Sequence, residues 1–173
     1  DFGTTSTQSF YVLADTDSAF TDVRTQLTRI GLNVQAERRL STGDPANWGT
    51  RRGWYVDLPA GERVNTDAAL VYGTFVFVSN QPSVAACESR SFLYVLSLAT
   101  GLQQPAEQFA EGVTPYAGIQ IGATFATRPV VMRLPNSRLI ALQRFYNNTS
   151  SRIELPVRLR MTPRKAAWRE VLR

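Results

Sequence analysis

Residues 52–64 read Arg52-Gly53-Trp54-Tyr55-Val56-Asp57-Leu58-Pro59-Ala60-Gly61-Glu62-Arg63-Val64, and residues 91–101 read Ser91-Phe92-Leu93-Tyr94-Val95-Leu96-Ser97-Leu98-Ala99-Thr100-Gly101. Apolar and aromatic residues come in short runs that turn residues interrupt, a pattern typical of β-strands. Between these stretches, two alternating runs meet at Tyr72-Gly73, where the glycine can take the positive φ of a tight hairpin turn. The Ala-Thr-Gly ending at Gly101 closes a third run. Together they predict an all-β chain of antiparallel strands.

A weak internal repeat extends this prediction along the chain. The runs Ser9–Leu13, Phe92–Leu96 and Arg138–Leu142 are similar, and the last two lie at the spacing of one propeller blade, about 40 to 50 residues. The first interval is longer, which indicates an insertion around 16-48. We therefore predict antiparallel blades of a partial β-propeller, about three of them, over residues 1-173.

The insertion has local signals of its own. Thr21 can cap a helix in which Val23, Leu27 and Ile30 recur at helical spacing, which predicts a helix of one or two turns. The stretch 32–40 alternates apolar and polar residues and predicts one half-buried strand.

Such an array cannot be complete by itself. Propellers close with roughly four to eight blades, and an open array exposes strand edges and apolar faces. We therefore expect preceding sequence, another chain or self-association to complete the propeller. The alternative is a compact β-sandwich that is complete in itself.

Four segments, taken in order, resemble a known family. They are Gly53-Trp54-Tyr55-Val56-Asp57-Leu58 with Gly61-Glu62-Arg63-Val64, then Gly73-Thr74-Phe75-Val76-Phe77, then Tyr94-Val95-Leu96 running on to Thr100-Gly101, and the tail Ala167-Trp168-Arg169-Glu170-Val171-Leu172. Their order resembles the C-terminal β-propeller of the type IV pilus tip-associated adhesins, the PilY family (PilC in some bacteria). The resemblance runs over nearly the whole chain.

The resemblance implies a non-enzymatic component of the pilus tip, which acts in pilus assembly, minor-pilin binding and adhesion to host or abiotic surfaces. It also implies an extracellular location, with the remainder of the propeller as the first partner. The alternative is a propeller-type enzyme or ligand-binding domain, such as a quinone-dependent dehydrogenase or a carbohydrate-binding domain. Blades of that enzyme class usually repeat a tryptophan docking motif, which does not repeat in this sequence.

Calcium is common in the resembled family, in an Asp/Asn-rich loop soon after the Thr-Gly strand end. Here the equivalent stretch, 102–111, has only two carboxylates, so we expect no calcium and no other cofactor from that loop. Asp15, Asp17 and Asp22 are weak calcium candidates, because Ala19 and Phe20 stand where a third ligand and a turn glycine belong. Helix capping is the preferred interpretation of these acids.

Composition excludes several chemistries. The 173-residue chain has no histidine, which excludes imidazole-activated nucleophiles, histidine general bases and histidine-containing metal sites. Cys87 is the single cysteine, which excludes an intrachain disulfide. We expect it to be inert, although a partner cysteine elsewhere is plausible in an extracellular protein. No hydrophobic run is long enough to span a bilayer, so we expect no membrane insertion.

The net charge of +5 comes from 19 Lys plus Arg against 14 Asp plus Glu. The arginines are scattered along strand-like runs, and only the stretch 152–173 concentrates them. Solvated faces and contacts with acidic protein partners explain this pattern better than nucleic acid does.

Two further groups of residues suggest functional sites. Asp57 and Glu62 could serve as an acid and a base, but in a strand-turn-strand segment we expect them to bond backbone amides and to pair with Arg51, Arg52 or Arg63. Trp54, Tyr55 and Trp168 could form a sugar-stacking platform, but blade packing predicts the same residues. We therefore expect no catalytic residue, and a structural role for the family-motif positions.

Overall fold

The computed structural model of the chain describes residues 6–83 and 89–158. Its elements are β1 (Ser9–Leu13), η1 (Arg24–Gln26), β2 (Thr28–Val34), β3 (Arg38–Thr42), β4 (Gly53–Asp57), β5 (Ala69–Val71), β6 (Thr74–Gln81), β7 (Arg90–Ser97), η2 (Ala106–Gln108), β8 (Gly118–Gly122), β9 (Val130–Arg133), β10 (Arg138–Arg144) and β11 (Ser150–Arg158). The prediction of an all-β chain is confirmed. Among the described residues, no helix is long or apolar enough to cross a membrane.

The strands form two sheets. Eight strands pair in the order β1-β4-β2-β3-β8-β7-β6-β5, and three pair in the order β11-β10-β9. The prediction of purely antiparallel strands is wrong at one pair, because β4 enters between β1 and β2 and runs parallel to β2. Gly53 permits this insertion: it has φ +138°, and a Cβ there would lie 2.0 Å from the carbonyl oxygen of Val12.

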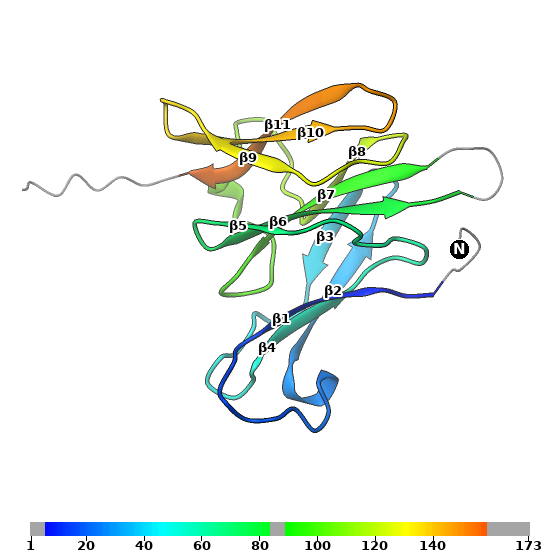
Figure 1. Cartoon of the computed structure of the whole chain (residues 1–173). Helices are drawn as coiled ribbons and strands as arrows, with labels where there is room; N and C mark the ends of the chain where they lie inside the picture. Colours follow the sequence, from blue (N-terminus) through cyan, green and yellow to red (C-terminus); the bar gives the residue numbers. More distant parts are fainter. Residues whose placement is uncertain (1–5, 84–88, 159–173) are drawn as a thin grey trace, which may run out of the picture.

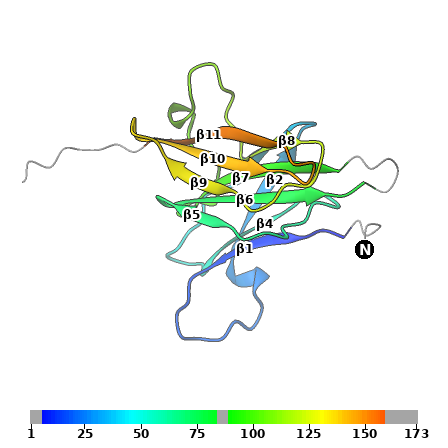
Figure 2. The same cartoon turned by 45° about the horizontal axis from the view of Figure 1, so that its top comes forward.

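The larger sheet curls, so that the chain packs in three layers (Figures 1 and 2). We call β1-β4-β2-β3 the first layer, β5–β8 the second and β9–β11 the third. The β6–β7 hairpin lies in the middle and is buried on both faces. One face packs on the first layer through Phe77, Phe92, Tyr94 and Leu96. The opposite face packs on the third layer through Val76, Val78, Leu93 and Val95.

Three layers are not the two-sheet sandwich that was the alternative prediction. Alternate residues of β6 and β7 fill two separate cores, which explains why both strands are nearly continuous apolar runs. The second layer is a meander of four consecutive antiparallel strands, and the third is a meander of three. The division of residues 1-173 into blades, with an insertion around 16-48, stays a prediction.

The region 16-48 differs from its local prediction. The expected helix is only the three-residue 3-10 turn Arg24–Gln26, and Thr21 does not cap it. Ile30 lies in β2 and is buried in the core between the first and second layers. The expected strand over 32–40 is instead a hairpin, in which β2 ends at Val34 and β3 begins at Arg38. The stabilisation gained by burying Ile30 in the sheet outweighs the weak local preference for a helix that its spacing indicated.

The predicted turns are confirmed. Tyr72 and Gly73 have φ of 48° and 72° and join β5 to β6. Gly101 has φ +72° after the β7 strand, and a Cβ there would lie 2.7 Å from Ile30 and 2.9 Å from Trp54. This glycine is therefore required by its conformation and by its close packing.

Candidate functional site

The family-motif segment Gly53–Val64 forms β4 and the loop that follows it. Trp54 is fully buried, and its indole N–H donates to the carbonyl of Leu98 at 2.9 Å. Its ring packs at 6.1 Å from both Phe10 and Phe75. Tyr55 is 7% exposed. Neither ring can offer an open face to a sugar, so packing is the role of this pair, and the sugar-platform alternative gains no support from them.

Asp57 is the centre of a polar network on the outer face of the first layer. Its carboxylate accepts hydrogen bonds from Ser9 at 2.6 Å and Arg24 at 2.9 Å, and lies 3.3 Å from Arg29. Arg24 also lies over the Tyr55 ring, 4.8 Å from its centroid. Burial alone would raise the pKa of Asp57, but the bonds from Ser9 and Arg24 hold it below its usual value.

Glu62 is the centre of a second, buried network. Its Oε1 accepts from Arg39 Nε at 3.0 Å and Arg39 Nη2 at 2.6 Å. Its Oε2 accepts from the hydroxyls of Ser79 and Tyr94, both at 2.7 Å. Glu62 is 0% exposed and Arg39 is 3% exposed. Burial raises the pKa of Tyr94 well above its usual range, and the negative charge of the neighbouring Glu62 carboxylate raises it further.

The predicted partners of these two acids are therefore corrected. We expected Arg51, Arg52 or Arg63, but Asp57 binds Arg24 and Arg29, and Glu62 binds Arg39. Arg51 and Arg52 instead donate to backbone carbonyls of residues 18–26. A carboxylate whose oxygens are all engaged in this way is a poor general acid or base, because a substrate proton has no free oxygen to reach.

The remaining motif residues have structural surroundings. Leu58 is buried, Val64 packs against the same core, and Gly61 has φ +80°. Arg63 exchanges two backbone hydrogen bonds with Asn80 of β6. The tail positions Trp168, Arg169 and Glu170 lie outside the described residues, as does Cys87.

The weak calcium candidates lie on an exposed loop of the first layer. Asp15 Oδ1 accepts from the backbone N–H of Asp17 at 3.1 Å, and Asp22 Oδ1 accepts from the N–H of Arg24 at 3.1 Å. Each acid thus stabilises its own turn. Over residues 6–83 and 89–158, no three side chains of the metal-binding types gather. In the stretch 102–111, Glu107 and Glu111 are exposed.

The third layer carries a surface that the sequence analysis missed. On the side away from β6–β7, Val130 of β9 opposes Leu142 of β10, and Met132 opposes Ile140. Val130, Met132 and Leu142 are 57%, 46% and 38% exposed. We call this side of β9, β10 and β11 the outer face of the third layer. The runs of β9 and β10 are apolar in both alternating positions, which is the signal of a sheet covered on both faces.

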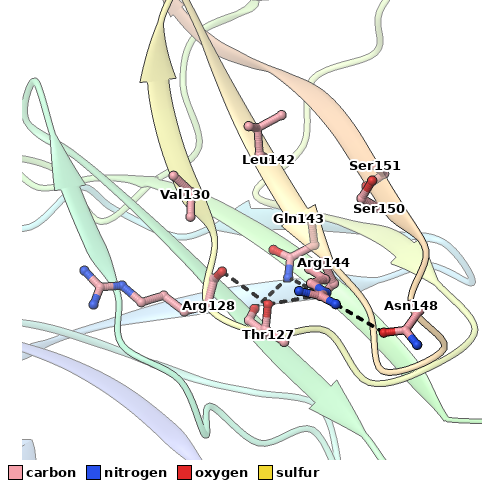
Figure 3. Close-up of a pocket in the computed structure, with 9 residues that line it drawn as sticks. All are labelled: Thr127, Arg128, Val130, Leu142, Gln143, Arg144, Asn148, Ser150 and Ser151. Atoms are coloured by element: carbon pink, nitrogen blue, oxygen red, sulfur yellow. Dashed lines mark hydrogen bonds between the residues drawn. The ribbon is translucent and has the colours of Figure 1, made fainter.

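A hollow of about 580 Å³ lies at one end of this surface (Figure 3). Thr127, Arg128, Val130, Leu142, Gln143, Arg144, Asn148, Ser150 and Ser151 line it. Apolar and polar groups therefore meet at this end of the outer face.

Comparisons with known proteins agree with the architecture. No family model matches the sequence, and no curated protein matches it significantly. Among solved structures, the crystal structure of the Pseudomonas aeruginosa PilY1 C-terminal domain matches with a TM-score of 0.65 and 13% sequence identity. The match covers 87% of this chain and 37% of that chain. This chain therefore has the fold of a part of that domain, and the resemblance read from the sequence is confirmed at the level of the fold.

Proposed function

We propose that this chain is part of the C-terminal β-propeller of a type IV pilus tip-associated adhesin, and that it acts there without catalysis. One observation carries the proposal. The segments that resemble the family are separate in the sequence, yet they contact one another in the fold. Glu62 of the second half of the motif binds Tyr94 at 2.7 Å. Trp54 packs against Gly101, in the turn that follows the Tyr94 strand, so closely that a side chain there would clash.

Within this proposal, the three layers are three blades of the propeller. The meanders β5–β8 and β9–β11 supply the second and third blades. The first blade is built from β1, β2, β3 and β4 and contains the insertion around 16-48. Stacking of blades face to face explains why the middle one is buried on both sides.

The proposed partners follow from the same assignment. They are the remainder of the propeller and the minor pilins at the pilus tip, and the assembled tip attaches to host or abiotic surfaces outside the cell. Nucleic acid is not a proposed partner, and we propose no membrane insertion.

Deleting the gene from its native host tests the function. We expect fewer surface pili by electron microscopy and weaker surface attachment, with both restored by the wild-type gene. An epitope-tagged copy should be found at pilus tips by immunogold labelling. Normal pili and attachment after deletion, with the tag absent from tips, would refute the proposal.

A further inference from the structure

The outer face of the third layer is more apolar than a solvated sheet face. Val130 opposes Leu142 and Met132 opposes Ile140, so two cross-strand pairs form one continuous patch on β9 and β10. Ile140 is only 5% exposed, whereas its neighbours in the patch are open to solvent. Antiparallel sheets with one wet face normally place polar residues there. The patch thus has the character of a covered face.

The outer face of the first layer, at the other end of the stack, differs in character. There, Asp57 holds Ser9 and Arg24, and Tyr11 stacks on Tyr55 with ring centroids 5.6 Å apart. Arg24 also donates to the Tyr11 hydroxyl at 3.1 Å. Polar groups on that face are paired with one another.

A buried amide lies beside the hollow at the end of the patch. Gln143 is 1% exposed, and its Nε2 donates to the carbonyls of Thr127 at 2.6 Å and Arg144 at 3.1 Å (Figure 3). These two acceptors fix the orientation of the amide. Gln143 Oε1 is left without a donor among the described residues, and so is the hydroxyl of Ser151. Both atoms are buried, and Gln143 and Ser151 alternate in register with Leu142 and Arg152, so they lie out of reach of a partner on the outer face and do not select it.

The charge of this face selects the kind of partner. By strand register, Arg152 lies beside Leu142 and Glu154 beside Ile140, while Arg138 and Arg144 stand at the two ends of β10. Three arginines therefore surround the patch against one carboxylate, and Glu154 is already bound to Arg138 at 3.0 Å. A second copy of the same face would bring like charges together. Carboxylates on the partner would be attracted instead.

We propose that the outer face of the third layer is the docking surface for a further antiparallel sheet of the propeller, with an aliphatic centre and carboxylates at its margin. The proposal rests on the proposed function, which assigns the chain to a larger propeller. The inner face of the same layer already packs on a sheet in this way, through Leu139, Ala141, Leu155 and Val157. The matched PilY1 domain is also longer, since this chain spans 37% of it.

Cysteine protection tests the proposal. In a Cys87→Ser background, Val130→Cys and Leu142→Cys are introduced both in the 173-residue chain and in the complete natural gene product. The matched control is Val113→Cys, a loop valine that is 44% exposed. We expect maleimide to label Val130→Cys and Leu142→Cys readily in the 173-residue chain. In the complete product their labelling should slow by on the order of tenfold or more, while Val113→Cys should keep its rate.

Equal labelling of Val130→Cys in both proteins would overturn the proposal, and so would equal slowing of Val113→Cys. Protection that depends on the concentration of the 173-residue chain alone would mean that a second copy covers the face, which also overturns it. Pilus number and attachment are measured in the deletion strain. Protection of the two cysteines together with normal pili and attachment after deletion would leave the docking surface standing and refute the proposed function.

Discussion

The buried pair of Arg39 and Glu62 allows the sharpest test of how this fold is stabilised. Glu62→Gln keeps the size of the side chain and removes its charge. The Arg39 side chain, which is 4% exposed, would then hold a positive charge without its counter-ion, stacked 4.0 Å from the Phe92 ring. Its remaining hydrogen bonds go to the carbonyls of Gln35 at 2.5 Å and Arg38 at 3.0 Å.

Breaking a buried ion pair by removing one partner costs about 3 to 5 kcal/mol. We therefore expect Glu62→Gln to lower the free energy of unfolding by that amount. Glu154→Gln is the matched control, because Glu154 and Arg138 form a pair whose side chains are 44% and 52% exposed. An exposed pair contributes about 0 to 1 kcal/mol. The difference between the two variants isolates the effect of burial.

Urea denaturation followed by tryptophan fluorescence measures both free energies, and the slope with urea should be the same for all variants. The double variant Arg39→Met with Glu62→Leu removes the stranded charge, so we expect it to be destabilised less than Glu62→Gln. It still leaves the Ser79 and Tyr94 hydroxyls without their acceptor, at a cost of about 1 to 3 kcal/mol. A Glu62→Gln protein as stable as Glu154→Gln would refute the reasoning.

Three other predictions concern a glycine and two titrating groups. Gly101→Ala should destabilise the chain more than Gly73→Ala, because both have φ +72° but only at Gly101 would the methyl group meet Ile30 and Trp54; equal melting temperatures would contradict this. The folded-state pKa of Asp57 is lowered, so its contribution to stability is present above its ordinary pKa of 3.8 and is lost as the pH falls below it; acid titration of Asp57→Asn, which should lose less stability in that range, checks the sign. Burial raises the pKa of Tyr116 from 10.0 to about 12, so stability should fall as the pH rises from 10.0 to about 12, and alkaline unfolding of Tyr116→Phe should lack that loss if the cause is right.

Local patterns in the sequence were enough to predict the hairpin of β5 and β6 and the strands β7 and β10. Alternation and turn residues act between near neighbours, so the Tyr72-Gly73 hairpin and the turn at Gly101 follow from a few adjacent residues. The weak helical spacing from Val23 to Ile30 misled for the same reason. That spacing is a local periodicity, whereas the burial of Ile30 in β2 depends on pairing with β4, which is distant in the sequence.

The sequence by itself determined that the chain is all-β, which chemistries its composition excludes, and which family it resembles. Only the tertiary structure decided the partners of the acids: Arg24 is 33 residues from Asp57, and Arg39 is 23 residues from Glu62. It also decided that β4 lies between β1 and β2, and that Val130 and Leu142 share an uncovered face. Strand order and face pairing are set by contacts between residues far apart in the chain, which no local pattern encodes.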